Sequence, residues 1–173
     1  DIFEEFKKQL KQFQNDGFVE PSKDIRDIIN TETKVKIGSG SFNKVYSYEL
    51  NDKCSERNTS VLIRISKEPL VEDDNTDLIQ SVKNICDMSK KDIHPKVYSI
   101  QLNSSGHLVV LMEPFESGNL SKYMKELSKS PNNEHIKYVH KSIAKQCSSI
   151  IDKIVDNKLA CLDIKPLNIV IKE

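Results

Sequence analysis

Apolar residues follow two different periods in the first part of the chain. Over residues 2–13 they recur at helical spacing, which predicts an amphipathic helix, and Gly17 and Pro21 mark its end. From Thr33 onward apolar and polar residues alternate, and three such runs predict three β-strands. These runs contain Val35 and Ile37, residues 45–48 and residues 61–65. We expect the three successive strands to form an antiparallel meander.

The middle of the chain returns to a helical period and then to strands. Apolar residues over 77–89 recur at i, i+3, i+4 and i+7, which predicts one helix that crosses over between strands. Residues 97–102 and 107–112 predict two further strands, joined by a turn at residues 103–106. The sheet is therefore expected to contain five antiparallel strands and to carry one crossover helix.

The last third of the chain has a helical pattern. After Pro114 the spacing predicts a short helix over 120–127 and a long helix over 135–155, with a loop at 131–133 between them. The predicted fold class is α+β, with the five-stranded sheet followed by a mostly helical part. The expected divisions are residues 1–23 for the N-terminal helix and linker, 24–113 for the sheet part and 114–173 for the helical part.

Composition excludes several classes of function. The 26 basic and 26 acidic residues cancel, so no overall field attracts nucleic acid or an anionic membrane, and we expect neither as a partner. Cys54, Cys86, Cys147 and Cys161 lack the spacing of a zinc site or a disulfide framework, which favours a reducing, cytoplasmic location. The apolar runs are too short to span a bilayer, and the N-terminus lacks a signal region. Both ends are expected to be cut from a longer protein.

Two stretches carry candidate chemistry. Gly38-Ser39-Gly40-Ser41 lies between two predicted strands, and glycine lets a ligand approach the main chain, although a flexible hairpin tip has the same composition. The second stretch is Leu-Asp-Ile-Lys-Pro-Leu-Asn at residues 162–168, between the long helix and the apolar residues 169–171. It resembles the catalytic loop of protein kinases, H-R-D-L-x-x-x-N, because Asp163 and Asn168 keep the required spacing. Lys165-Pro166 is similar to the serine/threonine-type members.

The order of elements supports this resemblance from about Lys34 to the end. Gly38, Gly40 and Val45 fit the kinase pattern G-x-G-x-x-G-x-V, with Asn43 in place of the third glycine. The chain thus resembles the small lobe and the first part of the large lobe of a divergent serine/threonine protein kinase, and it ends before the metal-binding Asp-Phe-Gly segment. The resemblance implies a protein kinase-like fold, ATP and Mg²⁺ as cofactors, and phosphoryl transfer to protein Ser/Thr hydroxyls.

The resemblance also implies roles for single residues. Asp163 would orient the proton of the substrate hydroxyl, Lys165 would offset charge on the γ-phosphate, and Asn168 would hold Mg²⁺ through its amide oxygen. Arg64 falls at the position of the third-strand lysine and is the third candidate catalytic residue. The residues implied to surround the nucleotide are Ile37, Gly38, Ser39, Gly40, Val45, Leu62, Met112, Glu113, Phe115, Asn119 and Val170. Ordinary core packing is the alternative interpretation of the apolar members.

The sequence departs from the kinase pattern at four places. Arginine stands in place of lysine at Arg64, with Lys44 and Lys67 as other candidate cations. No glutamate occurs over 77–89, and Asp77, Gln80 and Asp87 remain open as substitutes. The other two departures are Leu62 in place of the small residue above adenine and Cys161-Leu162 in place of the His-Arg of the catalytic loop.

Three alternatives to an active protein kinase remain. A pseudokinase that binds nucleotide or a partner is favoured by Arg64 and by the missing glutamate, and the sequence after Glu173 would discriminate. A kinase of sugars, choline or antibiotics is suggested by the stretch His94–Tyr98, but Lys165-Pro166 argues against it. A purely structural role comes last. We further expect a partner chain or a missing C-terminal segment to complete the large lobe, since the apolar side of the long helix would otherwise be uncovered.

Overall fold

The chain divides into two compact units, Asp1–Pro114 and Phe115–Glu173. The computed structural model describes residue 8 and residues 29–51, 60–69, 76–115, 118–159 and 164–171. Within 76–115, side chains are described from residue 82 onward. The helix predicted over 2–13 lies outside the described residues except for Lys8, and Asp163 also lies outside them. The predicted α+β class with a five-stranded antiparallel sheet is confirmed.

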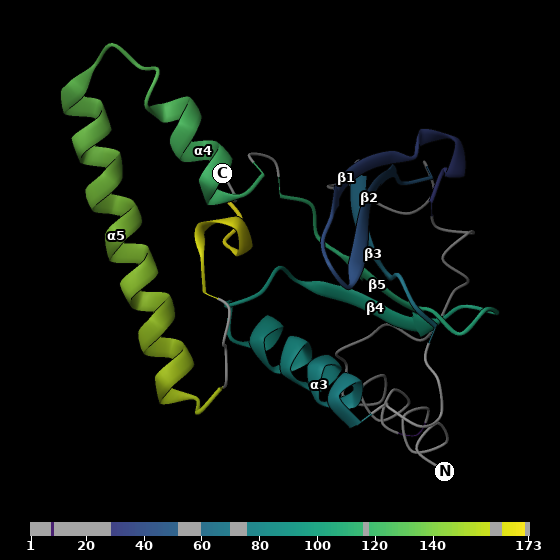
Figure 1. Cartoon of the computed structure of the whole chain (residues 1–173). Helices are drawn as coiled ribbons and strands as arrows, with labels where there is room; N and C mark the ends of the chain where they lie inside the picture. Colours follow the sequence, from purple (N-terminus) through teal and green to yellow (C-terminus); the bar gives the residue numbers. More distant parts are fainter. Residues whose placement is uncertain are drawn as a thin grey trace. The chain divides into compact units, whose positions relative to one another are not determined.

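The first unit is built around this sheet (Figure 1). Its strands are β1 Val35–Ser39, β2 Asn43–Glu49, β3 Ser60–Ser66, β4 Val97–Leu102 and β5 Leu108–Met112, in the order β1-β2-β3-β5-β4. Because β3 and β4 both pair antiparallel with β5, they run in the same direction, and the chain between them must cross over. Helix α3, Thr76–Lys90, makes this crossover. It extends the helix predicted over 77–89 by one residue at each end.

The two faces of the sheet carry different side chains, because successive residues of a strand point to opposite faces. On one face, Val61 and Ile63 of β3 pack with Val109 and Leu111 of β5 in a buried cluster. On the other face, Leu62 lies opposite Met112, and Arg64 lies opposite Val110. Successive side chains of a strand point to opposite faces, so Arg64 shares its face with three buried apolar residues. The described strand neighbours of Arg64 on this face are therefore apolar.

The second unit contains two helices. They are α4, Leu120–Leu127, and α5, Asn133–Asp156, and Figure 1 shows a short connection between them. Asn132 caps α5 by accepting a hydrogen bond from the backbone N–H of His135 at 3.0 Å, so the helix begins two residues before its predicted start. No helix among the described residues combines the length and the apolar character that crossing a membrane requires.

Candidate functional site

The glycine-rich stretch forms a β-hairpin between β1 and β2. Gly38 pairs with Val45 in the register of the two strands, and the N–H of Gly40 donates to the carbonyl of Asn43 at 2.9 Å. The carbonyl of Phe42 accepts from the N–H of Lys67 at 2.9 Å, which ties the turn to the end of β3. Backbone hydrogen bonds therefore join β1 to β2 within the hairpin and join its turn to the end of β3. The strand, turn and strand predicted from the sequence are present.

The packing of the protein does not require glycine at this hairpin. A Cβ atom built at Gly38 or at Gly40 meets no other atom within 4 Å, and neither glycine has the positive φ that L side chains avoid. Open space above the main chain is the condition under which a phosphate group could approach the backbone. Ile37 and Ser39, also predicted to lie near the nucleotide, flank Gly38 on β1.

We expect Gly40→Ala to leave the free energy of unfolding unchanged or slightly higher, because the added methyl group meets no atom and restricts the unfolded chain. The same methyl group would obstruct a phosphate at the backbone, so ATP affinity should fall severalfold. Chemical denaturation and calorimetric titration measure the two effects. Ser41→Ala, one residue further along the turn, is the control. A loss of stability equal to the loss of affinity would mean that the hairpin itself had been damaged.

Arg64 is a cation on β3 with no described counter-charge. Arg64 is half-buried. Burial lowers the pKa of its guanidinium, but an arginine side chain stays protonated in proteins. No carboxylate in the described part of the chain is found within ion-pair distance of it. Two exposed ion pairs lie far along the chain, Glu134–Lys137 on α5 and Glu126–Lys129 at the end of α4. A buried charge without a partner costs stability. An anion bound at Arg64 would offset this cost.

The other candidate cations lie elsewhere. In the pairing of β2 with β3, Lys44 lies opposite Ile65, while Val45 lies opposite Arg64, so the side chain of Lys44 is on the opposite face from that of Arg64. Lys67 follows the end of β3. Of the possible substitutes for the helix glutamate, Asp87 lies on α3 and is half-buried, whereas the side chains of Asp77 and Gln80 are outside the described set.

The end of β5 is joined to the loop between α3 and β4. Met112 is buried and lies opposite both Leu62 and Val97. The N–H of Glu113 donates to the carbonyl of Lys96 at 2.9 Å, and Oε1 of Glu113 accepts from the N–H of Lys96 at 2.8 Å. Two hydrogen bonds thus fix Glu113, one through its main chain and one through its carboxylate.

His94, in the same loop, is a polar residue of this region to which sequence reasoning gave no role at the site. Burial lowers the pKa of its imidazole to about 4; the carbonyl of Pro95 and the charge of Glu113 raise it, and the charge of Arg64 lowers it. The ring is therefore neutral near pH 7, within electrostatic reach of both Arg64 and Glu113. In the sequence, His94 is a lone histidine between a predicted helix and a predicted strand. Such a residue does not indicate a functional site until the fold shows which charged residues lie near it.

The second unit brings Lys165 and Asn168 together. Lys165 precedes the 3₁₀ turn Pro166–Asn168, and the N–H of Asn168 donates to the carbonyl of Lys165 at 2.8 Å. Both residues are exposed. In the described residues there is no cluster of three or more His, Cys, Asp or Glu that could hold a metal ion. The turn therefore offers one amide side chain and one ammonium group at the surface.

Asn119 and Val170 lie on two neighbouring segments of this unit. Oδ1 of Asn119 accepts from the N–H of Lys122 at 3.0 Å and so caps α4. Asn119 also forms an antiparallel bridge with Val170, and the N–H of Leu120 donates to the carbonyl of Ile169 at 2.7 Å. The chain just after the 3₁₀ turn is thus fixed to the start of α4. Phe115, at the start of the unit, is half-buried.

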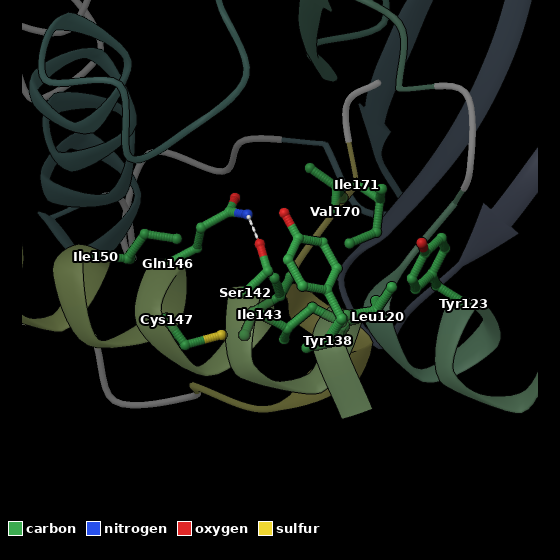
Figure 2. Close-up of a pocket in the computed structure, with 12 residues that line it drawn as sticks. Leu120, Tyr123, Tyr138, Ser142, Ile143, Gln146, Cys147, Ile150, Val170 and Ile171 are labelled. Carbon is green, nitrogen blue, oxygen red and sulfur yellow. Dashed lines mark hydrogen bonds between the residues drawn. The ribbon is translucent and has the colours of Figure 1, made fainter. Parts of the chain in front are cut away.

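A mostly apolar pocket of about 310 Å³ lies between α4, α5 and residues 169–171. Figure 2 shows the residues that line it. Val170 lines it, and its polar groups include the Ser142–Gln146 pair, joined by a 3.2 Å hydrogen bond. Neither Lys165 nor Asn168 lines it. Its character is therefore that of a surface for apolar packing and not of a phosphate site.

The chain was compared with known proteins. A family model described as protein tyrosine and serine/threonine kinase matches residues 31–168, which is more than half of the chain. No curated protein matches it significantly. The matched region runs from the turn before β1 to Asn168, and so contains the whole sheet, the glycine hairpin, Arg64 and the turn that holds Lys165. With the five-stranded antiparallel sheet and the helices that follow it, this match establishes that the chain belongs to the protein tyrosine and serine/threonine kinase family.

Proposed function

We propose that this chain binds ATP with Mg²⁺ and is part of a kinase that phosphorylates Ser and Thr hydroxyls of proteins. The observation that carries the proposal is Arg64, a half-buried cation on the face of β3 that also bears Leu62, with no described carboxylate to pair with it. Leaving such a charge unpaired is costly, whereas a phosphate offers the guanidinium a bidentate, charge-assisted contact. The glycine hairpin on the adjacent strands leaves its backbone accessible for the same ligand.

The remaining roles follow the family. Ile37, Gly38, Ser39 and Gly40 would cover the phosphates. Val45, Leu62, Met112 and Val170 would form the apolar surroundings of the adenine, and Glu113 and Phe115 would meet its polar edge through their backbones. Asn119 would contribute a polar contact to the nucleotide. Asn168 would hold Mg²⁺, a hard cation that prefers oxygen ligands.

Transfer itself would depend on the segment around Lys165. Asp163 would orient the hydroxyl of the substrate, and the ammonium of Lys165 would offset charge on the transferring phosphoryl group. Lys165-Pro166 supports a serine/threonine rather than a tyrosine specificity, since it is similar to that subset of the family. The scattered cysteines support a cytoplasmic location.

We also propose that further polypeptide, from a longer chain or from a partner, covers α5. Tyr138, Ile151 and Val155 on this helix are 73%, 45% and 67% exposed. Exposed apolar residues that gather on one element are typical of an interaction surface.

Calorimetric titration of ATP into the chain, with and without Mg²⁺, tests the nucleotide site. We expect Mg²⁺ to strengthen binding and Asn168→Ala to weaken the Mg²⁺-dependent affinity by about tenfold, the effect of losing about 1.4 kcal/mol of binding free energy. Asn133→Ala, at an exposed position at the start of α5, is the matched control. If a folded sample binds no ATP in either condition, the nucleotide site proposed here is wrong.

A nucleotide-binding pseudokinase is the second candidate. It is favoured by the guanidinium of Arg64, since a planar fork does not reproduce the geometry of a compact ammonium. Incubation with radiolabelled ATP and casein separates the two candidates, and phosphoamino acid analysis separates Ser/Thr from Tyr transfer. ATP binding without labelled casein would favour the pseudokinase for the chain.

A further inference from the structure

The pairing of β4 with β5 continues for one step beyond the ends of the two strands. Met112, the last residue of β5, lies opposite Val97, the first residue of β4. Beyond this pair, the backbone N–H of Glu113 donates to the carbonyl of Lys96 at 2.9 Å, as it would in an antiparallel ladder. Lys96 and Glu113 therefore form the next pair along the two segments.

The second hydrogen bond of this pair involves a side chain. In a regular hydrogen-bonded pair of antiparallel strands, the two residues exchange two main-chain hydrogen bonds. Here the backbone N–H of Lys96 donates to Oε1 of Glu113, at 2.8 Å. The carboxylate thus occupies the acceptor position that a main-chain carbonyl has in the ladder. Pro114 follows and has no N–H to donate, so the ladder cannot continue through it.

This side-chain bond strengthens an irregular part of the sheet. The register of β4 with β5 shifts by one residue between Val97 and Ser99, and such a shift disturbs strand pairing locally. A carboxylate forms a stronger hydrogen bond than a neutral carbonyl does. The side chain of Glu113 therefore holds the end of β5 to the loop after α3 at a place where the strand pairing is weakened.

The main chain that is held in this way borders the proposed nucleotide site. Met112 lies opposite Leu62, on the face of the sheet that also bears Arg64. We propose that Glu113 is a positioning residue: its carboxylate, by accepting from the N–H of Lys96, fixes its own main chain where the polar edge of the adenine is bound. This inference rests on the proposed function. A backbone segment that is already ordered binds a ligand more tightly, because binding does not have to order it.

Two substitutions separate the reach of this side chain from its charge. Glu113→Gln keeps an acceptor oxygen at the same reach but removes the charge, whereas Glu113→Asp keeps the charge and is one methylene group shorter. We expect the affinity for ATP, measured by calorimetric titration, to stay within about threefold of the wild type in Glu113→Gln and to fall about tenfold in Glu113→Asp. Amide hydrogen exchange of the Lys96 N–H should be about tenfold faster in Glu113→Asp than in the other two proteins.

Glu49→Asp, at the exposed end of β2, is the matched control and should change neither quantity. If the wild type binds ATP and Glu113→Asp binds it equally well, or if Glu113→Gln loses as much affinity as Glu113→Asp, the positioning role is wrong and the nucleotide site stands. An exchange rate at Lys96 that is the same in the wild type and in Glu113→Asp would also overturn the positioning role. If the wild type binds no ATP, this proposal and the nucleotide proposal are both wrong.

Discussion

Replacing Arg64 by methionine is expected to make the fold more stable and the nucleotide site weaker. The free energy of unfolding should rise by about 1 to 3 kcal/mol, because the change removes a half-buried charge that no described carboxylate compensates and fills its place with an apolar chain. The affinity for ATP should fall by about 10- to 100-fold, since the guanidinium would supply a charge-assisted contact of about 1.5 to 3 kcal/mol. Opposite signs for stability and binding are typical of functional sites.

Urea denaturation and calorimetric titration of the same samples measure these two effects. Lys83→Met, at an exposed position of α3, is the matched control, because it removes a cation of similar length without a burial cost. If Arg64→Met instead lowers both the unfolding free energy and the affinity, Arg64 has a structural counter-charge and is not held ready for an anion. If stability rises while the ATP affinity is unchanged, burial of Arg64 costs stability but Arg64 does not contact the nucleotide.

His94 is expected to make stability depend on pH between about 4 and 6.5. Burial, aided by the charge of Arg64, lowers the pKa of the folded imidazole from 6.5 to about 4, against the opposing effects of the Pro95 carbonyl and Glu113. Between pH 6.5 and about 4, His94 is therefore protonated in the unfolded chain but neutral in the folded chain. The free energy of unfolding consequently falls as the pH falls through this range. Between pH 7.5 and pH 5, the free energy of unfolding should lose about 2 kcal/mol from this group.

Denaturation of the wild type and of His94→Gln across this pH range isolates the contribution, because other titrating groups are common to both proteins. The difference in stability between the two should change by about 2 kcal/mol in favour of His94→Gln as the pH falls from 7.5 to 5. His140→Gln, at an exposed position on α5, is the control for the loss of a histidine. A difference that stays constant with pH would show that the folded imidazole titrates as the unfolded one does.

Most of the sheet could be predicted from the sequence, because strand and helix periods are local. Residues 97–102 form β4 as predicted, α4 occupies the predicted residues 120–127, and the remaining described elements differ at their ends by one or a few residues. The differences arise where a capping residue or a turn sets the position at which an element begins or ends. Thr33, taken as the start of strand pattern, belongs to the 3₁₀ turn Thr31–Thr33, in which its hydroxyl donates to the carbonyl of Asn30.

The type and order of the elements, the hairpin at Gly38 to Asn43, and the spacing of Asp163 and Asn168 that points to the kinase family could all be predicted from the residues alone. The neighbours of Arg64 from other strands could be known only from the tertiary structure. The strand register places Arg64 opposite Val110, and the hydrogen bonds of Lys96 to Glu113 fix the loop of His94. These neighbours come from segments some 30 to 50 residues away in the chain. Local periodicity carries no information about them, because sheet pairing and burial bring them together only when the chain folds.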